Sequence, residues 1–542
     1  MSDPRPEDVA EALRKGIAPS TLLDAVRVTV SDSLKAVVDT ARETLLVGDV
    51  PSKLLAHDAT LWGPDAESEA SIRLGWLDAV EVSRALLSEL LELRDALRAE
   101  GVDTVVLCGM GGSSLAPEVI CKTAGVPLTV LDSTHPDQVR AALGTDLARS
   151  VVVVSSKSGG TLETDSQRRV FAEAFTAAGI DAASRIIVVT DPGSPFSKLA
   201  ADEGYRAVFL ADPNVGGRYS ALTAFGLVPS ALAGVDVAGL LDEAAALDLS
   251  GDSPALLLGA ALGGSGRDKI AIDADASDLP GFGDWAEQLI AESTGKLGTG
   301  LLPVVVEPDA PEVRWPADDV HVVRIGTDTP QLGTAVDGAL GAQFLAWEYA
   351  TALAGRLLGI DPFDQPDVES AKKAARGLLD QAGAADPAAF VDDGIEVRAT
   401  DGLLGDITTV EGAIAALLDS LDPKGYLSVM AYLDRMRDSS LAAVRAPLAR
   451  RLERPVTFGW GPRFLHSTGQ FHKGGTPFGS FLQITGAVAE DLAIPDRPFT
   501  FGELITAQAA GDAGVLASKG RPVLRLHVPD VAGIERVRAL LT

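Results

Sequence analysis

The sequence predicts an α/β protein built on mainly parallel sheets that are covered by helices on both faces. From Asp103 onward, short runs rich in valine, isoleucine and leucine alternate with segments of helix length, which is the pattern of a parallel sheet. One of these runs, residues 151–154, consists of four valines and is typical of a strand buried on both faces. At 542 residues the chain is too long for one compact core, so we expect at least two domains.

Residues 1–100 are predicted to form a helical segment. Apolar side chains between residues 72 and 97 recur at helical spacing, and Gly101 can end the last helix. A first α/β domain is predicted over 101–250, with strands at TVVLCG, PLTVLD, SVVVVSS, RIIVVTD and YRAVFL. Ligands of such sheets bind beyond the carboxyl ends of the strands, so the loops that follow these strands are the first place to look for chemistry.

A second α/β domain is predicted over 251–542. RDKIAIDA, GLLPVVVE and HVVRIG are its first expected strands, with a helix around WAEQLIAESTG and a long apolar helix at ALGAQFLAWEYATALAGRLLG. Residues 375–440 are acidic and rich in alanine and leucine, so we expect inserted helices there. Strand character returns in VTFGW, FGSFLQIT and VLRLHVP.

The formal net charge of −30 argues against nucleic acid and against anionic membrane surfaces as partners. An anionic substrate would need a locally basic pocket in this acidic protein. Cys108 and Cys121 lie in or beside apolar runs, so buried thiols are expected rather than a disulfide or a metal site. The first residues lack the apolar core of a signal peptide, and no apolar run of about 18 residues is present, so we expect a cytoplasmic protein.

The loop after the valine strand has the composition of a phosphate cradle. It contains Ser156, Lys157, Ser158 and Thr161 with two glycines, and a predicted helix follows it. Backbone N–H groups at a helix N-terminus, together with hydroxyl groups and an ammonium, favour an anion. The alternative is an ordinary polar turn between a strand and a helix.

A second loop, GMGGSS, begins like a dinucleotide-binding fingerprint. Gly109 and Gly111 fit that motif and Asp132 ends the next strand, but Ser114 stands where the third glycine belongs. A bulkier polar residue there would crowd a pyrophosphate. A sugar phosphate contacted from both loops accounts for both of them, whereas a dinucleotide leaves the serine-rich loop unexplained.

Other candidate residues follow from spacing. Arg218 follows paired glycines at the mouth of the same sheet, where a guanidinium can bind an oxyanion. Gln288 and Glu292 are four residues apart and share one face of a helix, and partial burial would raise the pKa of Glu292 and make it a useful base. The alternatives are a surface arginine and a solvated helix glutamate.

Two further segments carry polar side chains that are candidates for a functional site. Gln365 and Lys372 are seven residues apart and nearly in line on a predicted helix, on which Lys373 would face solvent. FLHSTGQFHKGGTPFG places His466 and His472 in one glycine-rich turn. No group of cysteine, histidine and carboxylate residues has the spacing of metal ligands, so no metal site is predicted.

Five motifs in this order, GMGGSSLAP, SSKSGGTLET, GGRYSALTAFGL, QLIAESTGK and FDQPDVESAK, resemble the phosphoglucose isomerase family, which is built from two sugar-isomerase (SIS) domains. The resemblance implies two SIS-type three-layer α/β/α domains. It also implies interconversion of glucose 6-phosphate and fructose 6-phosphate through an enediolate, in glycolysis and gluconeogenesis, without metal or organic cofactor. The implied phosphate- and sugar-binding residues are Gly112, Ser113, Ser156, Lys157, Ser158, Thr161, Gln288 and Gln365, and the implied catalytic residues are Glu292 (proton transfer), Arg218 (enediolate stabilisation), Lys372 (ring oxygen) and a histidine.

The position of the histidine departs from the family pattern. The family usually carries a GQH-type loop between the glutamate and FDQ motifs, whereas here STGQFHKGG near the C-terminus is similar to it. The chain therefore resembles the long divergent isomerases sometimes found fused to transaldolase. Either His466 or His472 would open the sugar ring. In the family this histidine can come from a second subunit, so the resemblance allows a homodimer.

Three other functions stay open from the sequence. The chain could isomerise a related sugar, such as mannose 6-phosphate or a 6-sulfo sugar, since the anion loop alone does not select the sugar. It could be a non-catalytic SIS sensor of sugar phosphates, in which Glu292, Arg218 and Lys372 would be superfluous. The glycine-rich fingerprint allows a nicotinamide-dependent enzyme as a more distant alternative.

Overall fold

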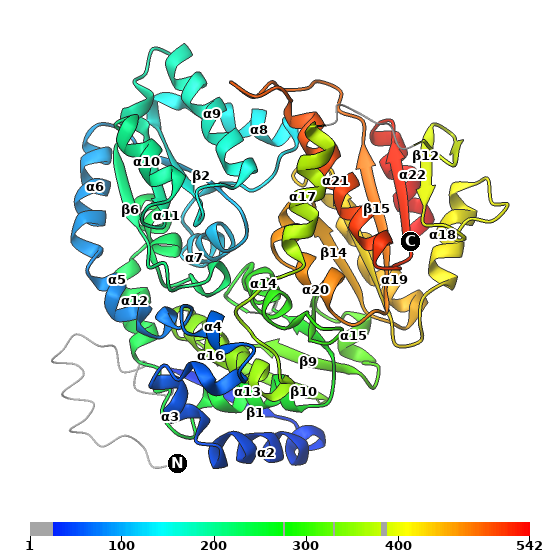
Figure 1. The fold of residues 1–542 in the computed structure, drawn as a ribbon, viewed down its shortest axis with the longest axis horizontal. Helices are drawn as coiled ribbons and strands as arrows, with labels where there is room; N and C mark the ends of the chain where they lie inside the picture. Colours follow the sequence, from blue (N-terminus) through cyan, green and yellow to red (C-terminus); the bar gives the residue numbers. More distant parts are fainter. Residues whose placement is uncertain (1–24, 275–276, 329–330, 381–386) are drawn as a thin grey trace.

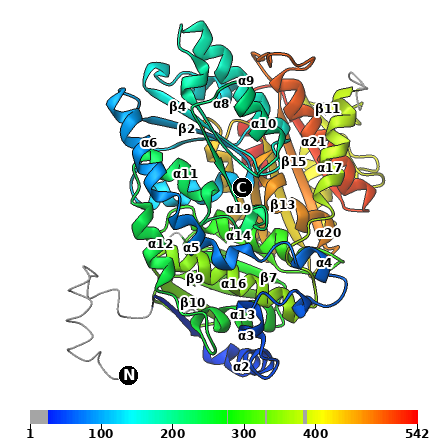
Figure 2. The ribbon, with the colours of Figure 1, turned by 60° about the vertical axis from the view of Figure 1, so that its left-hand side comes forward.

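The structure is a computed structural model that describes residues 25–274, 277–328, 331–380 and 387–542. Within these ranges the chain forms three sheets with helices packed around them (Figure 1). The first sheet lies on the left in Figure 1, the second at the bottom and the third on the right. Figure 2, turned by 60°, shows the first sheet above the second and the third beside them. The α/β class with mainly parallel sheets is confirmed.

The first sheet contains all five strands predicted between residues 101 and 250. Its order is β3-β2-β4-β5-β6 and every pair is parallel. Its strands are β2 (Thr104–Gly109), β3 (Thr129–Leu131), β4 (Ser150–Ser155), β5 (Ile186–Thr190) and β6 (Ala207–Leu210). The helices that follow them include α7 (Leu115–Thr123), α8 (Pro136–Leu143), α9 (Leu162–Ala177), α10 (Pro195–Asp202) and α11 (Ala224–Ala233). Gly109 pairs with Ser155 at the ends of β2 and β4, so the two polar loops leave the sheet side by side.

The second sheet has the order β1-β10-β9-β7-β8. Its parallel strands are β7 (Lys269–Asp273), β8 (Leu302–Val306), β9 (Val320–Ile325) and β10 (Gly333–Gly338). β1 (Val26–Val30) pairs antiparallel with β10, so the helical prediction for residues 1–100 is wrong at this segment. Its β-branched residues alternate along VRVTV and complete the sheet edge. Helices then occupy much of the segment, as α2 (Asp32–Val47), α3 (Val50–Leu55), α4 (Glu67–Ala70), α5 (Ala79–Arg84) and α6 (Leu87–Ala99).

The third sheet corrects the prediction of a helical insertion over 375–440. That region contains α17 (Val368–Asp380) and α18 (Val410–Asp419), but also β11 (Phe390–Asp392), β12 (Ile395–Ala399) and β13 (Tyr426–Tyr432). The sheet order is β11-β12-β16-β15-β13-β14. The remaining strands are β14 (Val456–Trp460), β15 (Gly479–Gly486) and β16 (Val523–Val528), as predicted. All seven residues of β13 are buried, so burial on both faces overrides the alanine- and leucine-rich composition.

Residues 251–542 therefore carry two sheets rather than one. The third sheet has its own apolar core beneath α18, α19 (Arg445–Leu452) and α22 (Val531–Leu541). A single larger cluster runs from the first sheet through α11 into the second sheet and α16 (Leu340–Leu358). The domain boundaries at residues 100 and 250 stay predictions.

Helices α14 (Phe282–Thr294) and α16 are buried on most faces because they lie inside this larger core. The rings of Phe282, Trp285, Phe344 and Trp347 pack against one another and fix the two helices together. Cys108 and Cys121 are free, buried thiols, as predicted. In the ranges that the structure describes, no helix combines the length and the apolarity needed to cross a bilayer.

Candidate active site

A cavity of about 660 Å³ opens at the carboxyl edge of β2 and β4. Its walls come from the loops after these strands, from the loop after β6, from α14, from residues 363–368 and from the segment after β14. These segments are far apart in sequence, and the sheet edge brings them together. Eleven of the thirteen predicted site residues line it: Gly112, Ser113, Ser156, Lys157, Ser158, Thr161, Arg218, Gln288, Glu292, Gln365 and His466.

The serine-rich loop closes on itself at the start of α9. The hydroxyl oxygens of Ser156 and Thr161 are hydrogen-bonded at 2.9 Å, so Thr161 does not cap the helix with its side chain. The backbone N–H of Gly160 donates to Ser158 Oγ at 3.2 Å, and Gly159 has a φ of +63°, which favours glycine. Hydroxyl groups and a helix N-terminus therefore face one end of the cavity, which suits a dianion.

The side chain of Lys157 in this loop already forms hydrogen bonds within the protein. Its Nζ donates to Asp191 Oδ2 at 2.6 Å and to the carbonyl oxygen of Pro213 at 3.1 Å. Burial raises the pKa of Asp191, although the ammonium opposes the shift. The positive charge of Lys157 is thus partly balanced by Asp191, and hydroxyl and N–H donors carry more of the anion-binding capacity than the sequence suggests.

Arg218 also lines the cavity, where several hydrogen bonds hold it in place. It is only 3% exposed, and its guanidinium makes four hydrogen bonds. Nε donates to Ser293 Oγ at 2.8 Å, and Nη1 donates to Gln365 Oε1 at 2.7 Å. Nη2 donates to the carbonyl oxygens of Pro362 and Asp364, at 2.8 and 3.1 Å. A fixed, buried cation of this kind stabilises developing negative charge without reorganising.

Glu292 and Gln288 face the cavity from one side of α14, as their spacing predicts. The Glu292 side chain is 15% exposed, so it is largely buried yet reachable. Its Oε1 lies 3.3 Å from Arg218 Nη1, and its Oε2 accepts from Gln288 Nε2 at 3.1 Å. Gln288 Nε2 also donates to the carbonyl oxygen of His466, at 2.7 Å. A carboxylate base and a guanidinium are therefore in contact in the cavity that the serine-rich loop also lines.

The turn at Gly111–Ser113 and the turn at Gly217–Tyr219 contact each other so closely that no side chain fits between them. A Cβ added at Gly112 would lie 1.9 Å from the carbonyl oxygen of Gly217. Because the nearest atom belongs to the backbone, it cannot move aside as the end of a flexible side chain can. Glycine at 112 therefore fixes how closely the Gly111–Ser113 turn approaches the turn that carries Arg218.

Replacing Gly112 by alanine is expected to push these loops apart. We expect a loss of about 1–3 kcal/mol of stability from overpacking, and a larger loss of kcat because Arg218 moves with its loop. Thermal denaturation and initial rates would measure the two effects. Gly514→Ala is a control for the substitution itself, since Gly514 lies in the helix Phe501–Ser518 with open space at its Cβ position and without a positive φ. Wild-type activity in Gly112→Ala would contradict this account.

Lys296 is a site residue that the sequence reasoning missed, although it ends the QLIAESTGK motif. Its Nζ donates to the carbonyl oxygens of Asp361 and Asp364, both at 2.6 Å, and to Asp364 Oδ1 at 2.5 Å. Arg218 and Lys296 thus both donate to the carbonyl oxygen of Asp364, in the loop that positions Gln365. Burial and repulsion by Arg218 lower the pKa of Lys296 to about 8.

Replacing Lys296 by methionine is expected to loosen this loop and lower kcat about tenfold, since buried carbonyl groups lose their donor. In the wild type, Lys296 is protonated below pH 8 and donates three hydrogen bonds; the neutral amine above that pH can donate two, so kcat should fall as pH rises through about 8. This decrease of kcat at alkaline pH should be absent in Lys296→Met. A pH–rate profile of both proteins measures it, and an unchanged decrease in the variant would count against the role of Lys296.

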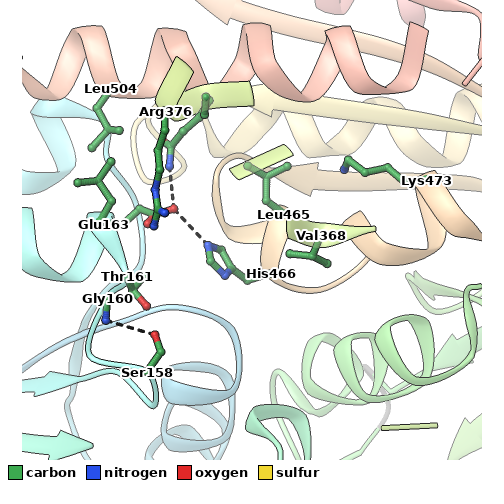
Figure 3. Close-up of a pocket in the computed structure, with 13 residues that line it drawn as sticks. Ser158, Gly160, Thr161, Glu163, Val368, Arg376, Leu465, His466, Lys473 and Leu504 are labelled. Atoms are coloured by element: carbon green, nitrogen blue, oxygen red, sulfur yellow. Dashed lines mark hydrogen bonds and ion pairs between the residues drawn. The ribbon is translucent and has the colours of Figure 1, made fainter. Parts of the chain in front are cut away.

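The structure separates the two histidines. His466 lines the cavity, and its Nε2 lies 3.2 Å from Glu163 Oε1 (Figure 3). The same oxygen accepts a hydrogen bond from Gln508 Nε2 at 2.7 Å. A carboxylate in this position orients an imidazole ring. Glu163 belongs to the SSKSGGTLET motif, but nothing local in the sequence indicates its partner.

The prediction of His472 as an alternative active-site histidine is corrected. Its ring packs among Tyr426, Phe464 and Phe481, at centroid distances of 6.0, 6.1 and 5.2 Å. Burial lowers its pKa well below the ordinary value. Within the described part of the chain neither ring nitrogen has a hydrogen-bond partner. His472, on α20 (Gly469–Gly474), is therefore a core residue of this aromatic cluster.

The cavity continues past His466 into a smaller space of about 270 Å³. Figure 3 shows Arg376 reaching from α17 toward the Ser158–Thr161 loop, a cation that the sequence analysis did not single out. Lys372 belongs to the same helix, but its side chain lies outside the described residues, so its predicted role stays a prediction.

Proteins similar to this chain in sequence or in structure bear the same name, glucose-6-phosphate isomerase. A probable glucose-6-phosphate isomerase of Haloarcula marismortui is 28% identical over 438 residues, covering 69% of this chain and 98% of the relative. A probable glucose-6-phosphate isomerase of Natronomonas pharaonis is 32% identical over 339 residues, covering 51% of this chain and 79% of the relative. The crystal structure of a glucose-6-phosphate isomerase from Chlamydia trachomatis matches with a TM-score of 0.54 at 19% identity, covering 68% of this chain and 92% of that one. No family model matches the chain.

Proposed function

The chain belongs to the glucose-6-phosphate isomerase family, and on this premise we propose that its cavity interconverts glucose 6-phosphate and fructose 6-phosphate through an enediolate. The observation that carries the proposal is the contact of Glu292 with Arg218, 3.3 Å apart, in the cavity that the serine-rich loop also lines. A base and a fixed cation beside an anion cradle are what an aldose–ketose isomerisation requires.

The phosphate is proposed to bind the loop of Ser156, Ser158 and Thr161. Hydroxyl and backbone N–H donors at the start of α9 would hold its oxygens, with Arg376 approaching from the other side. Binding energy from this remote group would fix the sugar chain in reacting geometry. Gly112 and Ser113 on the neighbouring loop would contact the sugar itself.

Glu292 is proposed to carry the proton. In the open-chain aldose it removes the hydrogen from C2, and the electron pair of that bond forms the C1–C2 double bond of the enediolate. The negative charge falls on oxygen, where the guanidinium of Arg218 stabilises it. A proton then passes from the C2 hydroxyl to O1, and return of the first proton to C1 gives the ketose. Because one proton moves between two carbons of one molecule, no metal or organic cofactor is required.

Ring opening is proposed to use His466. Glu163 accepts a hydrogen bond from its Nε2 in this assignment, which leaves Nδ1 for the sugar. Gln365 and Gln288 would hold sugar hydroxyl groups, since both amides line the cavity. His466 belongs to the same chain as Glu292 here; the homodimer and the assistance by Lys372 stay predictions.

A coupled assay tests the proposal. Purified protein is supplied with fructose 6-phosphate, and glucose 6-phosphate is measured through its dehydrogenase. Parallel reactions contain mannose 6-phosphate or a 6-sulfo sugar, with their own products measured. Turnover of fructose 6-phosphate as the preferred substrate supports the proposal. Binding without turnover would indicate a sensor instead, and preference for another sugar would reassign the substrate.

A further inference from the structure

A second groove, of about 520 Å³, is lined in part by Gly159 and Gly160 of the serine-rich loop. It is bounded by α9, α10 and α17 and by the segment that carries Arg497 and Phe499. Four of its lining residues are arginines: Arg168, Arg169, Arg376 and Arg497. Asp165 is the only acidic residue among the described residues that line it. The reaction proposed above uses none of the arginines at positions 168, 169 and 497.

The charges in this groove do not cancel. Asp165 Oδ1 accepts two hydrogen bonds from Arg168, and its Oδ2 accepts from Arg169 Nε at 2.7 Å and from Arg497 Nη2 at 2.8 Å. One carboxylate is therefore shared by three guanidinium groups. Arg169 also contacts Asp496, at 3.2 Å, so three guanidinium groups face two carboxylates. A surplus of one positive charge remains without Arg376, which the proposed function assigns to the sugar phosphate.

This surplus is unusual in a chain with a formal net charge of −30. Arg168 is only 8% exposed, so part of the positive charge is held away from water. Gathering like charges in a concave, partly buried site carries a free-energy cost that a bound anion removes. Guanidinium groups also match the geometry of phosphate oxygens.

Apolar side chains also line the groove: Phe196 and Phe499, together with Leu162 and Leu199. An inorganic ion would leave these side chains uncovered, whereas a ligand with a flat aromatic part would contact them. The size of the groove also lies in the range of pockets for organic ligands.

The groove and the reaction cavity share one loop. Gly159 and Gly160 line the groove, while their neighbours Ser158 and Thr161 line the reaction cavity. A Cβ at Gly159 would lie 2.7 Å from the backbone nitrogen of Phe196, so the loop rests directly on the first turn of α10. A ligand seated against Phe196 would therefore change the position or the mobility of the phosphate loop.

We propose that this groove binds an organic polyphosphate with an aromatic part, the chemistry of a nucleoside polyphosphate, and that binding there modulates sugar-phosphate affinity. The arginines hold the phosphate groups and the phenylalanine side chains contact the aromatic part. The regulatory half of this inference rests on the proposed function, whereas the binding half does not.

Binding of ATP, measured by calorimetry without magnesium, tests the groove directly. The same titration is run with saturating fructose 6-phosphate, which would displace ATP from the reaction cavity but not from the groove. Tripolyphosphate serves as the probe without an aromatic part. We expect ATP to bind with fructose 6-phosphate present, and several-fold more tightly than tripolyphosphate.

Arg169→Gln and Arg497→Gln, combined in one protein, should weaken ATP binding about 100-fold, at about tenfold for each charge-assisted hydrogen bond lost. Arg168 still pairs with Asp165 in this variant, and circular dichroism would check its fold. Arg538→Gln, at an exposed ion pair on α22, is the matched control for one lost charge. Basal isomerase activity should be unchanged, and ATP should shift the KM for fructose 6-phosphate in the wild type alone.

Three results would overturn the inference: displacement of ATP by fructose 6-phosphate, equal affinity of the double variant and the control, or equal affinity of ATP and tripolyphosphate. A protein that binds ATP in the groove but isomerises no sugar would refute the proposed function and leave the binding site standing. A protein that isomerises but binds no ATP would refute the site alone.

Discussion

Replacing Glu292 by glutamine is expected to lower kcat by on the order of 10²–10⁴, the range that a positioned general base supplies. The amide keeps nearly the same shape and can still accept from Gln288, which now donates to Glu292 Oε2 at 3.1 Å. It cannot take a proton from carbon. Sugar-phosphate binding should therefore change little, because the serine-rich loop holds the phosphate independently of this side chain. Initial rates and calorimetry with fructose 6-phosphate would separate the two effects.

Glu287 offers a matched control on the same helix. It lies next to Gln288 but lines a different cavity, where its Oε1 accepts from Ser467 Oγ at 3.2 Å. Glu287→Gln should retain activity close to that of the wild type. Exchange of the C2 hydrogen with deuterated solvent is a second readout, and it should stop only in Glu292→Gln. An active Glu292→Gln variant would exclude the proposed role of this carboxylate.

Replacing Arg218 by lysine is expected to lower kcat by about 10²–10³, the usual effect of removing one preorganised donor at a developing oxyanion. Lysine keeps the charge but cannot reproduce four hydrogen bonds in fixed directions. The carbonyl oxygens of Pro362 and Asp364 would lose a donor, so the thermal midpoint should also fall. Glu292 would lose its 3.3 Å contact with the guanidinium.

Arg206→Lys is a suitable comparison, since Arg206 forms an exposed ion pair with Glu100 away from the cavity. It should leave kcat and the thermal midpoint nearly unchanged. In Arg218→Lys, an inhibitor that mimics the enediolate should lose more affinity than fructose 6-phosphate does, because the guanidinium is proposed to act mainly on the charged intermediate. Equal losses for both ligands would indicate that Arg218 only shapes the cavity.

Most of the site followed from short stretches of sequence. A run of valines ending in SSKSGGT specifies a buried strand, a tight turn and a helix N-terminus within a few residues, so its anion-binding character is local. The four-residue spacing of Gln288 and Glu292 likewise fixes their shared helix face. The first sheet, whose strands are all parallel and apolar, was predictable for the same reason.

Other features depend on contacts between distant segments. Residues 426–432 form a fully buried strand only because other strands and helices cover both of its faces. His466 and His472 stand in the same glycine-rich segment, yet one meets Glu163 at the cavity and the other packs among aromatic rings. Lys296 gains its importance from carbonyl groups about 65 residues away.

The sequence by itself determined the α/β class, the phosphate-type loop and the proton-transfer carboxylate as a candidate, because neighbours in the chain define each of these. Tertiary structure alone decided that the described residues form three sheets, which histidine faces the cavity, and how Arg218 and Lys296 share one loop. Those outcomes depend on burial and on hydrogen bonds between segments whose proximity only the folded chain creates.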